Sequence, residues 1–224
     1  MKPIHILLVC LLILIVGGCI YNRYVADFQL DDKNRLKLMD ECRFSGKEFG
    51  DDWEIGECSV AIQIIPHCRN VLEIGGGAGK VSHMINKLLG TRGLSERHVV
   101  LEPGGEGDMG KGAIEHNKAS FGDNYTIVKK YANDIDQSDL RPLNGPPDCL
   151  YADCEGCLLG FFDTEIGNYV LDNVRYIVNE MDGFTLDAEV DEKLRNIWKQ
   201  AGFTKIGEGY GCGVQCETDI WYRP

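Results

Sequence analysis

Short apolar runs alternate with amphipathic segments along the chain from about residue 70 onward. The run Val71-Leu72-Glu73-Ile74 is typical of the first kind, since β-branched and leucine side chains dominate it. The segment 189–202 is typical of the second kind, because Leu194, Trp198 and Ala201 recur at helical spacing. Strands that alternate with helices predict an α/β fold with a doubly wound, mostly parallel sheet.

The pattern assigns seven strands to this sheet. The last two strands are separated by a short loop without a helix, so they are predicted to form a C-terminal antiparallel hairpin. The strands are expected at residues 71–75, 99–102, 125–131, 148–153, 174–180, 203–208 and 218–222, and the helices at 78–89, 113–121, 158–168 and 189–202.

The N-terminus has a different composition from the rest of the chain. Residues 4–21 are almost uninterruptedly apolar, which is the short end of the length that spans a bilayer. We expect a signal-anchor or transmembrane segment at 1–23, a stalk and N-terminal helical region at 24–60, and the α/β domain at 61–224. A cleaved signal peptide, followed by secretion, is the alternative.

The side of the membrane is indicated by opposing signals. Basic residues after the apolar segment favour a cytosolic domain by the positive-inside rule. The 10 cysteines favour an oxidising compartment, and Asn124-Tyr125-Thr126 is a glycosylation sequon. We therefore expect a single-pass membrane protein whose domain is lumenal or extracytoplasmic.

Charge and cysteine spacing argue against nucleic acid as a partner and against zinc as a ligand of the cysteines. The formal net charge of −12 argues against a nucleic-acid substrate held through its phosphates. Cys154-x-x-Cys157 and Cys212-x-x-x-Cys216 have ligand-like spacing, but no histidine lies near either pair. Buried thiols or one disulfide explain these cysteines better than zinc does.

A glycine-rich turn follows the first predicted strand. Glu73, Gly75, Gly77 and Gly79 match the pattern acid-x-Gly-x-Gly-x-Gly, and Gly76 lies within it. This is the form found in S-adenosylmethionine (SAM) enzymes of the Rossmann-like class. Backbone that lacks Cβ atoms can approach a ligand closely, and the following helix start offers free N–H groups.

Other glycine loops fit less well. A Walker A loop needs a glycine where Ile74 stands and a Ser or Thr where Val81 stands. A dinucleotide fingerprint needs its third glycine at position 80, which is Lys80. A glycine turn without a ligand is the remaining alternative.

Polar residues follow the other predicted strands. Glu102 ends the second strand, where a carboxylate can accept hydrogen bonds from both ribose hydroxyls. Asn133 and Asp134 follow the third strand and are candidates for contacting adenine, or else form a surface turn. Asp153 and Glu155 follow the fourth strand and are candidates for catalytic base and orienting group, or else form a hydrated acidic turn or a helix N-cap.

Four pieces of the sequence carry a family resemblance, namely Val71–Gly77, Leu101-Glu102-Pro103, Asp153-Cys154-Glu155-Gly156 and Val178-Asn179-Glu180. Through them the sequence resembles the FkbM-type methyltransferases, a branch of the SAM-dependent Rossmann-like enzymes, over about residues 65–210. It departs from that family in the first loop, which is Gly75-Gly76-Gly77-Ala78-Gly79, and in Cys157 and Leu158 after the Glu-Gly pair.

This resemblance implies SAM as the cofactor and O-methylation of a sugar, a glycan or another small hydroxyl compound. A non-catalytic Rossmann-like interaction module and a nicotinamide-dependent oxidoreductase are the alternatives. No metal site is predicted, although Asp153 and Glu155 could bind a divalent ion through oxygen.

Overall fold

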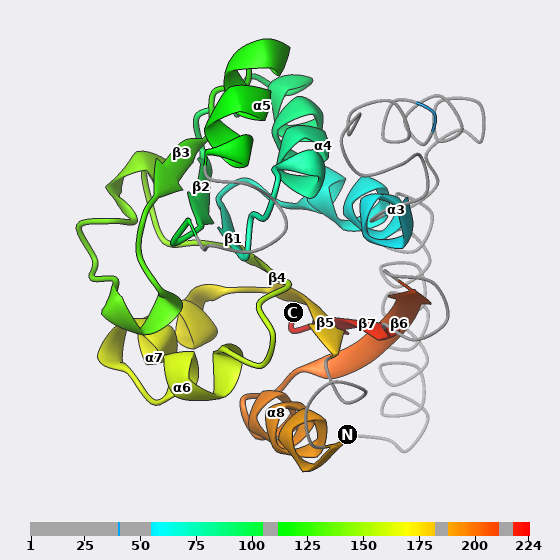
Figure 1. Ribbon diagram of the computed structural model, residues 1–224. Helices are drawn as coiled ribbons and strands as arrows, with labels where there is room; N and C mark the ends of the chain where they lie inside the picture. Colours follow the sequence, from blue (N-terminus) through cyan, green and yellow to red (C-terminus); the bar gives the residue numbers. More distant parts are fainter. Residues whose placement is uncertain (1–39, 41–54, 105–111, 182–187, 211–216) are drawn as a thin grey trace, which may run out of the picture. The chain divides into compact units, whose positions relative to one another are not determined.

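The computed structural model describes residue 40 and residues 55–104, 112–181, 188–210 and 217–224. Seven strands form one sheet in the order β3-β2-β1-β4-β5-β7-β6 (Figure 1). The strands are β1 (Val71–Ile74), β2 (His98–Leu101), β3 (Thr126–Val128), β4 (Cys149–Ala152), β5 (Tyr176–Met181), β6 (Thr204–Tyr210) and β7 (Glu217–Tyr222). The helices are α3 (Ile55–Ile64), α4 (Lys80–Gly90), α5 (Ala113–Phe121), α6 (Leu158–Phe162), α7 (Glu165–Asn173) and α8 (Ala188–Gln200), with short 3-10 turns η1 (Ile65–His67), η2 (Ala132–Asp134) and η3 (Arg141–Leu143).

The sheet topology confirms the predicted doubly wound fold. Strands β3, β2, β1, β4 and β5 pair in parallel, whereas β7 is antiparallel to both β5 and β6. The chain moves outward from β1 to β3 and then returns to place β4 on the other side of β1. Ligands of open α/β sheets bind beyond the carboxyl ends of the strands at such a reversal.

Helices cover both faces of the sheet. Helices α3, α4 and α5 lie on one face, and α6, α7 and α8 lie on the other (Figure 1). The larger core packs Leu72, Leu150 and Ile177 of the sheet against Trp198 of α8, and Trp221 of β7 contacts Trp198 with ring centroids 5.4 Å apart. This apolar layer holds β4 and β5 in place, and with them the polar residues that follow.

The segment expected as one helix at 158–168 is two helices, so that prediction is wrong. Thr164 has extended backbone dihedrals and caps α7, because its Oγ1 accepts a hydrogen bond of 3.0 Å from the Gly167 N–H. Gly167 also packs on the backbone of the preceding helix, where a Cβ would lie 1.9 Å from the Phe161 oxygen. The chain therefore turns sharply between α6 and α7.

Two N-terminal predictions lie outside the described residues, namely the apolar segment at 1–23 and most of the region 24–60. Within the described part of the chain, no helix combines the length and apolar character needed to cross a membrane. Helix α3 continues across the boundary expected at residue 61, and it packs against α4 and β6.

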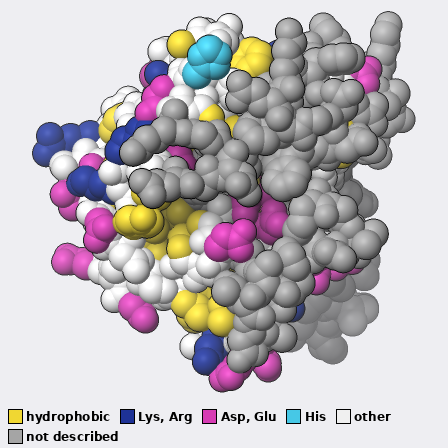
Figure 2. Space-filling view, in the orientation of Figure 1, with side chains coloured by type: hydrophobic (Ala, Val, Ile, Leu, Met, Phe, Trp, Pro, Cys, Tyr) yellow, Lys and Arg dark blue, Asp and Glu magenta, His cyan; other side chains and the backbone are white. Residues whose placement is uncertain are grey.

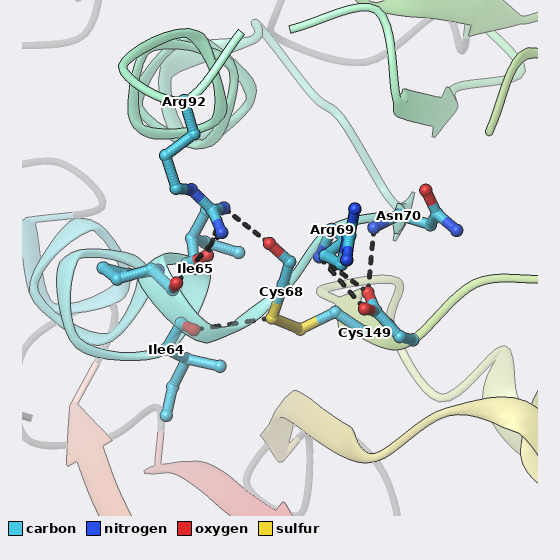
Figure 3. The surroundings of a disulfide bond; sticks show 9 residues. Ile64, Ile65, Cys68, Arg69, Asn70, Arg92 and Cys149 are labelled. Atoms are coloured by element: carbon cyan, nitrogen blue, oxygen red, sulfur yellow. Dashed lines mark hydrogen bonds between the residues drawn. A yellow bond between two sulfur atoms is a disulfide. The ribbon is translucent and has the colours of Figure 1, made fainter. Parts of the chain in front are cut away.

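A buried disulfide joins the segment just before β1 to the first residue of β4. Cys68 and Cys149 are both fully buried and are separated by 81 residues in the sequence. The Arg92 side chain donates hydrogen bonds to the carbonyls of Ile65 and Cys68 beside this bond (Figure 3). The disulfide therefore fixes the amino ends of the two central strands.

Candidate active site

The glycine loop lies against the turn that follows β4. Gly75 has φ +88°, and a Cβ at this position would lie 1.6 Å from the Asp153 carbonyl oxygen. A Cβ on Gly76 would lie 2.4 Å from Cγ1 of Val100. Both glycines are therefore required for packing, and the loop presents bare backbone at the carboxyl edge of the sheet.

Glu102 organises this edge through its carboxylate. One oxygen accepts a hydrogen bond of 2.9 Å from the Gly77 N–H, and the other accepts one of 2.9 Å from the Gly104 N–H. A carboxylate has about four acceptor positions, so two protein donors leave capacity for further hydroxyl donors. The predicted ribose ligand Glu102 is thus placed directly beside the glycine loop.

Glu73 lies beneath the loop. It is 2 % exposed, and its two oxygens are bound by Ser82 Oγ at 2.8 Å and by His98 Nε2 at 2.7 Å. These contacts tie α4 and β2 to β1. A direct contact of Glu73 with a cofactor stays a prediction, because both oxygens already serve the protein.

The turn after β4 carries the two predicted catalytic carboxylates in different settings. Asp153 is half-buried, and its N–H donates to the Ile74 carbonyl at 2.9 Å, which keeps the turn next to β1. Glu155 is exposed and has a left-handed backbone with φ +53°. A disulfide between Cys154 and Cys157 closes this turn.

Asp153 belongs to a cluster of three carboxylates. Oxygen atoms of Asp153, Glu57 of α3 and Glu180 of β5 lie within 4.8 Å of one another. In Figure 2, acidic side chains gather on the face over the ends of β4 and β5. Glu155, the partner that the sequence suggested for Asp153, is not a member of this cluster.

Glu57 was not among the site residues expected from the sequence. A usable signal was present, because Glu57 is the one charged residue of a mostly apolar helix. It stands next to Cys58 and one turn before Ala61, and both of these neighbours are fully buried. An acid within a buried helical stretch is rare unless it is paired. Glu180 was identified only as part of the resemblance.

Tyr151 lies among these acids. It is buried, and its hydroxyl donates a hydrogen bond of 2.8 Å to the backbone carbonyl of Glu57. Burial, and then the negative charges of Glu57, Glu73 and Asp153, raise the pKa of Tyr151 well above its usual value. The phenol is therefore a neutral hydrogen-bond donor throughout the physiological range.

The predicted adenine contacts Asn133 and Asp134 lie on the 3-10 turn η2, and both are exposed. Asn133 lies against α6, since a Cβ on Gly160 would be 2.8 Å from its Nδ2 atom. The structure thus places Asn133 beside α6, the helix that follows the turn after β4. Its role in binding stays a prediction.

Two hollows in the described part of the chain lie away from this site. One of about 380 Å³ and another of about 320 Å³ share Gln137 and Tyr169, and the first also contacts Gly145 and Pro146 before β4. The strand-end site contains only a small cavity of about 10 Å³, lined in part by Glu57, Gly75 and Asp153. We assign the site by its chemistry and by the sheet reversal rather than by volume.

Comparison with known proteins supports the fold. No family profile matches the sequence, and no curated protein matches it at a significant level. Among solved structures, the O-methyltransferase TomG from Streptomyces achromogenes, in complex with SAM, has a TM-score of 0.55 at 18% identity and covers 83% of this chain and 88% of its own.

Two further structures show how widely the fold is shared. Cofactor-bound Rv0187 from MTB has a TM-score of 0.52 at 17% identity and covers 90% of this chain and 95% of its own. The fibrillarin pre-rRNA processing protein from Methanococcus jannaschii has a TM-score of 0.52 at 14% identity and covers 74% of each chain. The chain therefore has the class I methyltransferase fold, as its strand order and its C-terminal hairpin indicate.

Proposed function

We propose that this protein is a SAM-dependent methyltransferase that methylates a hydroxyl group. The observation that carries the proposal is the position of Glu102, which is hydrogen-bonded to Gly77 of the glycine loop at the sheet reversal. A nucleoside whose ribose binds Glu102 would extend its other end along Gly75 and Gly76. The turn that carries Asp153 then lies next to the reactive end.

SAM fits the site better than a nicotinamide cofactor. Lys80 replaces the third glycine of the dinucleotide fingerprint, and it is 2 % exposed in the first turn of α4. The added antiparallel hairpin β6–β7 is absent from plain dinucleotide folds. TomG, which shares the fold, was crystallised with SAM.

The reaction requires few groups from the protein. SAM, when bound, would supply an activated methyl group, which the acceptor oxygen would take as the carbon–sulfur bond breaks and the sulfonium is left as a neutral thioether. The hydroxyl proton passes to a carboxylate, for which Asp153 and Glu155 are the candidates. The main contribution of the fold is alignment of the oxygen with the methyl group.

The acceptor class rests on the FkbM resemblance. It favours a sugar, a glycan or another small hydroxyl compound, and the net charge of −12 disfavours nucleic acid. The proposed setting is a lumenal or extracytoplasmic domain anchored by residues 1–23. The disulfides Cys68–Cys149 and Cys154–Cys157 support an oxidising compartment.

Calorimetric titration of the full-length protein with SAM tests the proposal, followed by transfer of a labelled methyl group to candidate sugars. Glu102→Ala removes a charged acceptor, so SAM should bind roughly 10- to 100-fold more weakly. Glu96→Ala, an exposed acid before β2, serves as the matched control. Equal SAM affinity in the two variants would contradict the placement of the ribose.

The alternatives give different results in the same experiments. A non-catalytic module would bind SAM without methyl transfer to any acceptor, or would bind neither SAM nor NAD. An oxidoreductase would bind NAD in place of SAM.

A further inference from the structure

We infer that Glu57, Asp153 and Glu180 form a binding site for a divalent cation beside the proposed methyl-donor site. The three carboxylates come from distant parts of the chain, namely α3, the end of β4 and β5. The fold brings one oxygen of each to within 4.8 Å of the other two. This inference deepens the proposed function, and it rests on that function only for the role of the cation.

The spacing matches the size of a coordinated ion. Carboxylate oxygens bind Ca²⁺ at about 2.3–2.6 Å and Mg²⁺ at about 2.0–2.1 Å. Two oxygens on opposite sides of such an ion are therefore about 4–5 Å apart, and adjacent ligands are closer. The separations of up to 4.8 Å in this cluster fall within that range. Three hard oxygen ligands favour Mg²⁺, Mn²⁺ or Ca²⁺ over softer metals.

Burial gives an independent reason to expect a ligand. Glu180 is 8 % exposed, and its carboxylate makes no hydrogen bond or ion pair with any residue in the described part of the chain. Burying a carboxylate is costly unless it is paired or coordinates a metal. Glu180 nevertheless points toward the oxygens of Glu57 and Asp153, which are themselves acidic.

The surroundings hold these groups in place. The hydrogen bond from the Tyr151 hydroxyl to the Glu57 carbonyl joins β4 to α3. The hydrogen bond from the Asp153 N–H to the Ile74 carbonyl holds Asp153 beside β1. Asn179 donates from Nδ2 to the Glu180 carbonyl at 2.6 Å, at the point where β5 approaches β7. Glu57 and Glu180 thus stand on a helix and a strand, which position ligands more precisely than loops do. Asp153 directly follows β4, in the turn that its N–H bond to Ile74 anchors.

The position of the cluster suggests the role of the cation. Asp153 supplies a carboxylate to the cluster, and its backbone carbonyl lies against Gly75 of the glycine loop. A cation held there could bind the acceptor oxygen through an open coordination position and orient it toward the methyl group. This would favour acceptors that offer a hydroxyl with a neighbouring oxygen for chelation.

Binding of Mn²⁺ alone to the full-length protein tests the site, because the electron paramagnetic resonance signal of free Mn²⁺ decreases on binding. We expect one equivalent to bind, and Mg²⁺ to displace it. Glu180→Gln and Glu57→Gln keep the side-chain shape, and each should weaken Mn²⁺ binding at least tenfold. Glu192→Gln, an exposed acid on α8, is the matched control and should leave Mn²⁺ binding unchanged.

The result that overturns the inference is equally specific. The site is refuted if the folded protein fails to bind Mn²⁺ at about 1 mM, the weak end of protein sites for divalent cations. Equal affinity in Glu180→Gln, Glu57→Gln and the control also refutes it. Near-ultraviolet circular dichroism shows whether each variant is folded.

A SAM titration in the presence of a chelator separates the two proposals. SAM binding without Mn²⁺ binding removes only the cation site, whereas Mn²⁺ binding without SAM binding removes the methyltransferase.

Discussion

Replacing Gly75 with alanine tests the packing of the glycine loop on the turn that follows β4. The new Cβ would start 1.6 Å from the Asp153 carbonyl oxygen, and real Cβ atoms essentially never approach within 3.0 Å. The two backbones must therefore separate by a further 1.4 Å. The residue also has φ +88°, which costs a non-glycine residue about 1–2 kcal/mol.

The expected loss of stability follows from these two terms. Overpacking of a well-packed site costs about 1–3 kcal/mol, so Gly75→Ala should lower the free energy of unfolding by about 2–5 kcal/mol in total. Gly93→Ala is the matched control, because Gly93 has φ +68° but a Cβ added there would meet no atom within 4 Å. It should lose only the backbone term, about 1–2 kcal/mol.

Denaturant unfolding of the two variants with their disulfides intact gives this comparison directly. Methyl transfer gives a second readout, since a displacement of about 1 Å at a reacting centre can cost about 100-fold in rate. We expect this loss in Gly75→Ala and not in Gly93→Ala. Equal stability of the two variants, with equal SAM affinity, would refute the contact between the loop and the turn.

Three further predictions concern stability and chemistry. Arg195 donates to the buried Asp219 at 2.8 Å; burial alone would raise the pKa of Asp219, but Arg195 and Lys205 hold it below the usual 3.8. The stability that the Asp219 carboxylate provides is therefore complete above about pH 5 and is lost as the pH falls below 3.8. The difference in unfolding free energy between the wild type and Asp219→Asn should shrink in acid. A difference that stays constant with pH contradicts this prediction. From loop length alone, removing Cys68–Cys149, which spans 81 residues, should lower the free energy of unfolding by about 4–5 kcal/mol. Removing Cys154–Cys157, which spans 3 residues, should lower it by about 2 kcal/mol. Unfolding of the paired Cys→Ala variants measures both losses. Asp153→Asn should lower kcat at least 100-fold with SAM affinity within threefold, and an unchanged kcat would exclude Asp153 from the chemistry.

The sequence predicted the fold well because its signals are local. The apolar run at Val71–Ile74 and the positive-φ glycines after it define the central strand and its turn. Helical spacing in 189–202 was equally clear, since Leu194 and Trp198 do lie on the buried side of α8. The break between α6 and α7 was missed, because its cause is the contact of Gly167 with Phe161 in three dimensions.

The site was predicted only in part. Glu102 is identifiable from its place at the end of a strand, and the structure shows its carboxylate hydrogen-bonded to the glycine loop. Its contact with a ribose stays a prediction. The grouping of Glu57 with Asp153 could not be read from the sequence, because it depends on how α3 packs beside β4. Glu155 was the natural partner by spacing, but its left-handed backbone leaves it outside the carboxylate cluster.

The hydrogen bond from Tyr151 to the Glu57 carbonyl has a practical consequence for expression of shorter fragments. It joins two residues 94 positions apart, and both are buried. A fragment that begins at residue 61 lacks the Glu57 carbonyl, so the buried Tyr151 hydroxyl would lose its hydrogen-bond acceptor. This loss would lower the free energy of unfolding by about 1–3 kcal/mol. Fragments intended for crystallisation should therefore begin upstream of Ile55, so that they include the whole of α3.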